Sequence, residues 1–147
     1  MSSCYGYGAV IEKSDVRESA YEEMRKKLVE SDWDIKRDYL EFLEDENRED
    51  CSSSFEHWIK SVYENETYLW SGFEGFLVDY INHVEFNDET ILRYEDYCIY
   101  VAATLPSNEE ERAKIPTTEQ IRSIIEKYVN PYYVEPKTCS WETIELD

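Results

Sequence analysis

The sequence predicts an α+β fold, a single domain in which a small mixed β-sheet of three to five strands packs against about five helices. Its 147 residues are the size of one ordinary domain, and 41% of them are hydrophobic, enough for a core of the usual relative size. Several segments repeat apolar residues at helical spacing, and the apolar run at 97–103 is typical of a strand covered on both faces. No internal repeat or long linker divides the chain, so we expect residues 1–147 to form one acidic domain.

The chain begins with alternating residues at 4–11, which predict a strand. Gly6 and Gly8 within it predict that another backbone or a helix passes close by. Ser14 or Asp15 is expected to cap the first helix. The apolar stripe of this helix recurs every four residues, at Val16, Ala20, Met24 and Leu28.

Two further amphipathic helices are predicted before residue 64. Ser31 and Asp34 form a capping-box pattern before the first, and Ser53 and Glu56 form one before the second. The first has an apolar face of Ile35, Tyr39, Phe42 and Leu43, and the second has one of Phe55, Trp58, Ile59 and Val62.

The central helix of the core is predicted next, because its apolar face is wide. That face contains Phe73, Phe76, Leu77, Tyr80, Ile81 and Val84. A turn at 87–88 precedes strands at 90–94 and 97–104, with a turn between them at 95–96. Thr117 and Gln120 then cap a last helix, and residues 132–134 and 138–146 read as extended, so a right-handed strand–helix–strand crossover is expected here.

The negative charge is concentrated in residues 31–100, which hold nineteen acidic and five basic residues and therefore carry −14 of the net −19. Such a surface repels nucleic acid and anionic membranes, so we expect neither as a direct ligand. It favours a basic protein as partner. The alternative, that the acidity serves only solubility, stays open at this stage.

The four cysteines, Cys4, Cys51, Cys98 and Cys139, form no C-x-x-C pair and have no histidine at ligand spacing. We therefore expect free thiols, no metal and no cofactor. The first residues lack the features of a signal peptide, and no apolar run is long enough to cross a bilayer, so a cytoplasmic location is expected.

No catalytic pattern accompanies the two histidines, His57 and His83, so we expect no enzyme activity. His57 lies beside an apolar stripe, where a structural role is the usual one. The sequence favours an acidic protein-binding inhibitor, a nucleic-acid mimic that blocks the basic groove of a host defence nuclease, as a phage anti-CRISPR or anti-restriction protein does. The alternatives are an immunity protein that neutralises a toxic nuclease, and an acidic structural or regulatory subunit.

Exposed acids on the second and third helices are the expected partner contacts. They are Asp38, Glu41, Glu44, Asp45, Glu49, Asp50, Glu64 and Glu66. Trp33, Tyr63, Tyr68 and Trp70 are candidate aromatic anchors among them.

Overall fold

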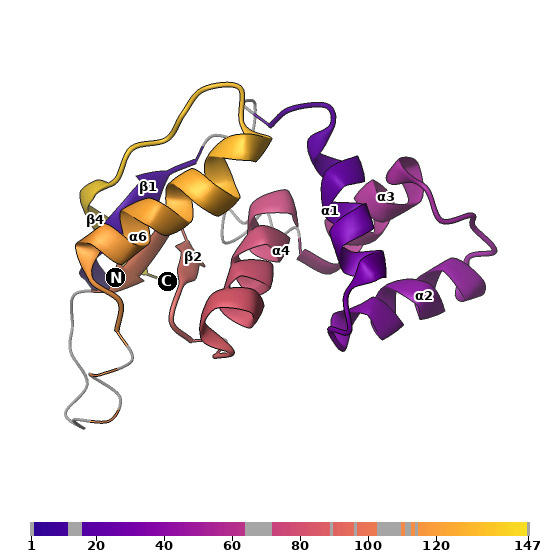
Figure 1. The fold of residues 1–147 in the computed structure, drawn as a ribbon, viewed down its shortest axis with the longest axis horizontal. Helices are drawn as coiled ribbons and strands as arrows, with labels where there is room; N and C mark the ends of the chain where they lie inside the picture. The colour runs from indigo at the N-terminus through magenta and orange to yellow at the C-terminus, as the bar shows by residue number, and fades with distance from the viewer. Residues whose placement is uncertain are drawn as a thin grey trace.

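A computed structural model describes residues 2–11, 16–63, 72–88, 90–95, 97–102, 110, 113 and 115–146. The predicted α+β fold is confirmed: a four-stranded sheet packs against helices (Figure 1). The described strands are β1 (Ser2–Val10), β2 (Arg93–Glu95), β3 (Cys98–Ala102) and β4 (Ser140–Leu146). The described α-helices are α1 (Ala20–Glu30), α2 (Ile35–Asp45), α3 (Ser52–Tyr63), α4 (Gly72–Ile81) and α6 (Thr118–Ile124).

The sheet has the order β2-β3-β1-β4, and every pairing in it is antiparallel. The prediction of a mixed sheet was therefore wrong, because no two neighbouring strands are parallel. The strand–helix–strand passage is nevertheless a crossover. Both β3 and β4 run antiparallel to β1, so they are parallel to each other, and α6 lies in the connection between them. The crossover passes over β1, which lies between these two strands in the sheet.

The two glycines of β1 allow the close approach that the sequence predicts. A Cβ at Gly8 would lie 1.8 Å from the carbonyl oxygen of Ile99, and one at Gly6 would lie 2.5 Å from the ring of Tyr100. The sheet curls so far that β2 and β4, at its opposite edges, approach each other. Cys98, Tyr100 and Ile144 fill the inside of this curl as a small second core.

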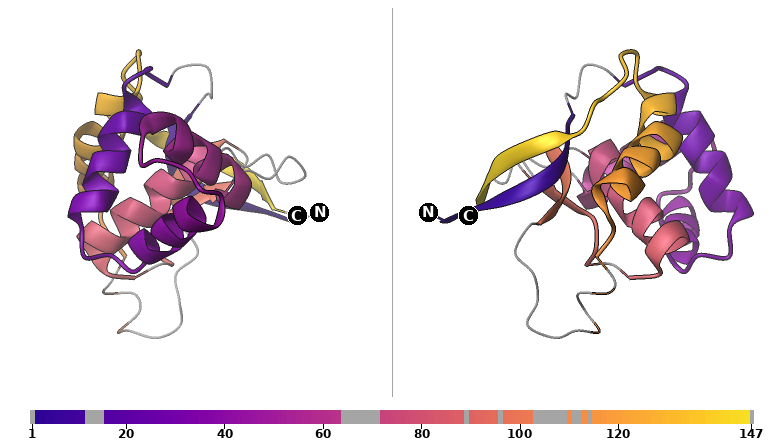
Figure 2. Two further views of the ribbon diagram at one scale, coloured as in Figure 1. Left: turned by 90° about the vertical axis from the view of Figure 1, so that its right-hand side faces the viewer. Right: turned by 60° about the vertical axis from the view of Figure 1, so that its left-hand side comes forward.

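The other face of the sheet packs against the helices and belongs to the main core. There Ile99 of β3 is fully buried, as expected for a strand covered on both faces, and Ala9 of β1 is 1% exposed. Residues of α6 cover this face, and the guanidinium Nε of Arg122 donates to the hydroxyl of Tyr7 at 2.6 Å. Figure 2 shows the ribbon of β1 and β4 extending beyond the helices.

The helix α4 lies at the centre of the core, as its wide apolar face predicts. The ring of Phe76 lies 5.4 Å from that of Phe55 and 5.6 Å from that of Trp33, so α4 joins α3 to the α1–α2 connection. A Cβ at Gly72 would lie 2.9 Å from the side chain of Ile59, which shows how closely α4 and α3 approach. Val84, the last residue of the predicted face, is 43% exposed.

Glu74 of α4 is fully buried, and its Oε1 accepts a hydrogen bond of 2.8 Å from the hydroxyl of Tyr133. Burial, followed by the charge of Glu74, raises the pKa of Tyr133, so this hydroxyl keeps its proton and remains the donor. The bond ties the helical layer to the chain before β4. It also removes one carboxyl group of residues 31–100 from the protein surface.

Helix α1 begins at Ala20, later than its stripe predicts. Val16 instead forms an isolated β-bridge with Tyr133, and the N–H of Arg17 donates to the carbonyl of Tyr132 at 2.8 Å. Those bonds hold the chain extended before the helix starts. The predicted cap at 14–15 lies outside the described residues.

Two helices of the core continue as π-helix, at Asn82–Phe86 after α4 and at Ile125–Val129 after α6. The buried side chain of Asn82 accepts from the N–H of Leu92 and donates to its carbonyl. Because this bonding occupies Leu92, β2 begins only at Arg93, later than expected. The predicted turn at 87–88 is confirmed, with Asn87 at φ 50°. None of the described helices is long and apolar enough to cross a membrane.

Truncating Ile99 to Ala should lower the free energy of unfolding by about 2–5 kcal/mol, because Ile99 is fully buried in a central strand. Urea denaturation monitored by circular dichroism measures the change. Val134→Ala is the control, because Val134 is 63% exposed and its truncation should have little effect. Equal stability of the two variants would contradict the core described here.

Candidate partner-binding surface

Helix α2 lies at one end of the molecule, away from the sheet (Figure 1). Only two of its side chains are fully in the core: Tyr39, which is completely buried, and Leu43, which is 8% exposed. They are four residues apart and so share one face, which packs against α3 and α1. Ile35 and Phe42 are partly buried against the core, and the opposite side of α2 faces solvent.

Four exposed carboxylates lie in line along the solvent side of α2. Asp34 precedes the helix in helical conformation, and Asp38, Glu41 and Asp45 follow at helical spacing. With 3.6 residues per turn they fall within roughly 60° around the helix axis and span about 16 Å along it. None of the four makes an ion pair with any residue that the structure describes. We call these four residues the acidic ridge.

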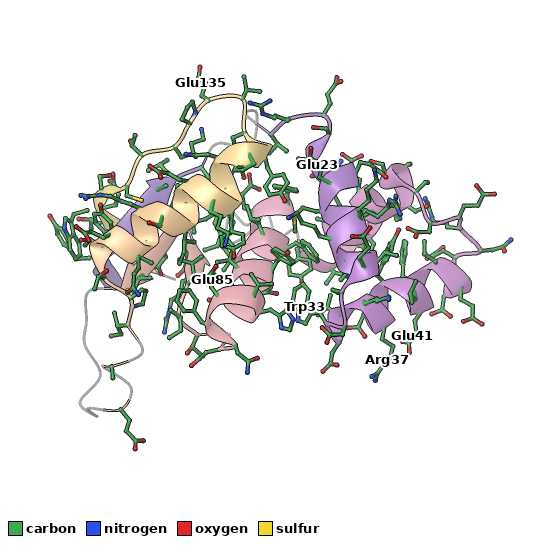
Figure 3. The ribbon with its side chains drawn as sticks, viewed as in Figure 1. Glu23, Trp33, Arg37, Glu41, Glu85 and Glu135 are labelled. Carbon is green, nitrogen blue, oxygen red and sulfur yellow. The ribbon has the colours of Figure 1, made fainter. Side chains whose placement is uncertain are left out.

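Other charges surround the acidic ridge. Glu44, Glu46 and Glu49 are exposed and add negative charge. Arg37 projects into solvent from the same helix as Glu41 (Figure 3). Arg48 lies over the ring of Phe42, at 6.0 Å from its centroid. The surface around α2 is therefore strongly negative, with a few cations at its sides.

Most of the predicted contact residues that the structure describes lie on or beside this surface. Asp38, Glu41, Glu44 and Asp45 are exposed on α2, and Glu49 is exposed in the connection to α3. Glu64 and Glu66 lie outside the described residues.

Asp34 was missed as a surface residue because its spacing from Ser31 resembles a capping box. Its side chain makes no capping hydrogen bond. The hydroxyl of Ser31 instead donates to the carbonyl of Leu28 at 2.6 Å and accepts from the N–H of Trp33. Ser31 thus closes the end of α1. The helical spacing of Asp34 from Asp38 was the signal that could have identified it.

Asp50 has an internal role. Its carboxylate lies 3.1 Å from the guanidinium of Arg25 and accepts a 2.6 Å hydrogen bond from the hydroxyl of Tyr39. Arg25 also pairs with Glu22 one turn earlier on α1, and this bond lowers the pKa of the Glu22 carboxyl. Burial, followed by the bond to Asp50, raises the pKa of Tyr39. The network joins α1, α2 and the start of α3, and so holds the acidic ridge in place.

Helix α3 begins at Ser52, so Ser53 lies within the helix and does not cap it as predicted. The thiol of Cys51, just before the helix, lies 3.5 Å from the hydroxyl of Ser54. Hydrogen bonds from the side chain and backbone of Ser54 lower the pKa of this exposed thiol. By contrast, burial raises the pKa of the Cys139 thiol.

The two candidate aromatic anchors that the structure describes, Trp33 and Tyr63, are partly buried against the core. Trp33 stacks on His83 at 5.0 Å between ring centroids, and Tyr63 packs edge-on against Phe76. Tyr68 and Trp70 lie outside the described residues. The most exposed apolar side chain on α2 is Leu40, at 43%. Leu40 and Trp33 line a shallow hollow of about 480 Å³ beside the acidic ridge.

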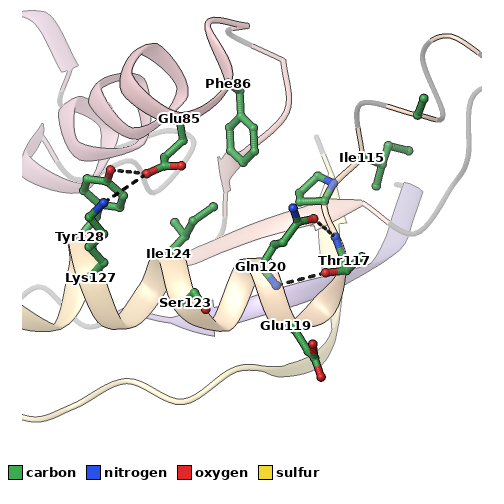
Figure 4. Close-up of a pocket in the computed structure, with 12 residues that line it drawn as sticks. Glu85, Phe86, Ile115, Thr117, Glu119, Gln120, Ser123, Ile124, Lys127 and Tyr128 are labelled. Atoms are coloured by element: carbon green, nitrogen blue, oxygen red, sulfur yellow. Dashed lines mark hydrogen bonds and ion pairs between the residues drawn. The ribbon is translucent and has the colours of Figure 1, made fainter.

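A second hollow, of about 640 Å³, lies between the π-helical end of α4 and α6 (Figure 4). The carboxylate of Glu85 accepts a hydrogen bond from the hydroxyl of Tyr128 and lies 3.8 Å from the ammonium of Lys127. Phe86 and Ile124 form apolar walls. Glu85 and Lys127 at this hollow are paired with each other, unlike the carboxylates of the acidic ridge.

Both histidines make aromatic stacking contacts, His57 on Phe42 and His83 on Trp33. Within the described ranges, no group of three or more His, Cys, Asp or Glu residues is arranged to hold a metal ion. No protein-family model matches the chain, and no curated protein and no solved structure shows significant similarity to it. Its function must therefore be argued from the surface itself.

Replacing Asp50 by Ala should lower the free energy of unfolding by about 1–2 kcal/mol, because Arg25 and Tyr39 both lose a partner. Glu49→Ala is the matched control, since it removes the same charge next to Asp50. Chemical denaturation of both variants and the wild type compares them. If Asp50→Ala is no less stable than Glu49→Ala, the network does not hold α2.

Cys51 should react with a thiol reagent faster than Cys139 at neutral pH, because its lowered pKa gives more thiolate and its side chain is exposed. The pH at which its rate reaches half its maximum should lie below that of an unstructured cysteine peptide measured alongside. Mass spectrometry of partly labelled native protein identifies the first site. Earlier labelling of Cys139, or a Cys51 profile centred above that of the peptide, would contradict the assignment.

Proposed function

We propose that this protein is a protein-binding inhibitor whose acidic ridge occupies the basic nucleic-acid groove of a partner. The observation that carries the proposal is the line of four exposed carboxylates along one side of α2, none paired with a described residue. A charge pattern left unpaired on a folded helix is available to an external partner. The network of Arg25, Asp50 and Tyr39 supports the proposal because it keeps the helix in a fixed position.

Nucleic acid is held largely by Lys and Arg side chains that contact regularly spaced phosphates. Neighbouring carboxylates three or four residues apart on a helix lie roughly 5–6 Å apart, so the acidic ridge presents negative charge at short, regular intervals. Such complementarity speeds association and makes binding sensitive to salt. The partner is therefore a basic protein, and nucleic acid itself is repelled.

A single exposed carboxylate pair contributes only about 0.2–1 kcal/mol, so the proposal requires many contacts acting together. The acids around the ridge, Glu44, Glu46 and Glu49, supply more of them. Leu40 adds an exposed apolar contact in the same surface. Affinity thus depends on the whole surface of α2 rather than on one residue.

Two biological settings use an inhibitor of this kind. One is a phage or plasmid protein that blocks a host defence nuclease, of the anti-CRISPR or anti-restriction type. The other is an immunity protein that neutralises a toxic nuclease. Both need a negative face that fits a basic groove. Identification of the partner distinguishes the two settings.

Reversal of Asp38, Glu41, Glu44 and Asp45 to Lys should abolish partner binding while leaving the fold intact, because all four side chains are exposed. The wild type and the variant are immobilised in parallel, and host-lysate proteins that only the wild type retains are identified by mass spectrometry. We expect nucleic-acid-binding enzymes, which elute with salt or with added DNA or RNA.

The matched control reverses Glu18, Glu23, Glu126 and Glu135, four exposed acids away from α2, to Lys. It has the same net charge as the first variant, so it separates the local surface from overall acidity. The control should retain the partner. Retention by both variants, or loss from both, would contradict a site on α2.

A further inference from the structure

Two large aromatic side chains are exposed side by side on the ribbon of β1 and β4. Tyr5 is 59% exposed and Trp141 is 51% exposed, and their ring centroids lie 6.2 Å apart. In the register Tyr7 lies opposite Trp141 and Tyr5 opposite Thr143, so the two rings share one face of the sheet. The edge of Trp141 also packs on Tyr7 at 5.3 Å. We call Tyr5 and Trp141 the aromatic platform.

The aromatic platform is the part of this face that the described helices leave uncovered. Further along β1, Tyr7 is 5% exposed and Ala9 is 1% exposed, because α6 and the main core cover them. Arg122 of α6 bonds to the Tyr7 hydroxyl, one step before the platform. Large adjacent aromatics held on a rigid sheet and left in solvent are typical of interaction surfaces, where Tyr and Trp contribute most of the binding energy.

One carboxylate lies beside the aromatic platform, and on the same face the guanidinium of Arg122 already lies over the ring of Tyr7, at 5.7 Å from its centroid. Glu145 is exposed and lies on the same face of β4 as Trp141, opposite Ser3 and diagonal to Tyr5. A carboxylate beside an exposed aromatic ring is the combination that a guanidinium group uses, because it stacks on the ring and pairs with the oxygens. The net charge of −19 attracts such a group from a distance.

We propose that the aromatic platform binds an extended, arginine-containing segment of a partner protein. The guanidinium groups stack on Tyr5 and Trp141, and one of them pairs with Glu145. A second copy of this chain is disfavoured as the occupant, because each copy carries −19. Single-stranded nucleic acid, which also stacks on aromatic rings, is repelled by the same charge.

The aromatic platform lies at the opposite end of the molecule from α2, since β1 and β4 are at the left of Figure 1 and α2 is at the right. It is therefore a second surface, separate from the acidic ridge. Both can be occupied at once, so the chain is able to hold two basic segments of one partner or of two.

The test uses the full chain with Asp38, Glu41, Glu44 and Asp45 reversed to Lys, because this background replaces three of the four ridge carboxylates and the adjacent Glu44 with positive charge. The probe is a capped peptide of alternating Arg and Gly, and the same peptide with Lys is the comparison. Calorimetry gives the affinity for this background and for Trp141→Ala, Tyr5→Ala and Glu145→Gln added to it. Val134→Ala, a change at an exposed apolar residue outside the sheet, is the control.

We expect each aromatic truncation to weaken binding of the Arg peptide roughly two- to fivefold, and the Lys peptide to bind more weakly than the Arg peptide. Glu145→Gln should also weaken binding, although it leaves both aromatic rings in place. This variant therefore tests the proposal even if an aromatic truncation perturbs the fold. Val134→Ala should have no effect. Unchanged affinity in all three variants, equal affinity for the Lys peptide, or tighter binding of an oligothymidine strand than of the Arg peptide would overturn the proposal.

Discussion

The constraint on which this structure depends is the mutual repulsion of its carboxylates. A chain of net charge −19 folds only if apolar burial outweighs that repulsion, and most of the negative charge lies in residues 31–100. Packing of aromatic side chains in the core supplies much of this burial. Phe76 of α4 touches rings from α3 and from the α1–α2 connection, and so joins three parts of the helical layer at one point. Apart from Glu74, which is fully buried, the carboxylates of α2, α3 and α4 are exposed or half-buried.

Helix α2 carries four exposed acids and has few anchors in the core. It is anchored by Tyr39 and Leu43 and by the bonds of Asp50 to Arg25 and Tyr39. Asp50 is thus one acid of the region whose charge is used internally, and Glu74 is another, buried against Tyr133. The acids of the ridge have no such use within the described residues. These unpaired carboxylates are the basis of the proposed partner surface, and the charge-reversal experiment separates that role from a role in solubility alone.

Local patterns predicted much of the fold. The order of strands and helices, the central position of α4, the capping box of Thr117 and Gln120, and the close approach at Gly8 all follow from spacing and residue type. Long-range bonds explain the differences. Val16 pairs with Tyr133, more than one hundred residues away, and Asn82 bonds to Leu92, so α1 and β2 both start later than their patterns predict. The direction of each strand likewise depends on pairings that residue spacing does not encode.

The acidic surface was predictable in position but not residue by residue. Helical spacing placed Asp38, Glu41, Glu44 and Asp45 on the exposed side of α2, because charged residues opposite an apolar stripe face solvent. Spacing could not show that Asp50 bonds to Arg25, since these residues come from different elements. The aromatic platform was not predictable either, because Tyr5 and Trp141 meet only when β1 pairs with β4.

The most direct test of the account is the salt dependence of affinity for the partner that the wild type captures. Dissociation constants are measured over a range of salt concentrations for the wild type and for a variant with Asn or Gln at the four positions of the acidic ridge. The account predicts a steep loss of affinity with salt for the wild type and a clearly shallower slope for the variant, because fewer charge pairs are screened. Equal slopes would show that the ridge does not contact the partner, and would contradict the central claim.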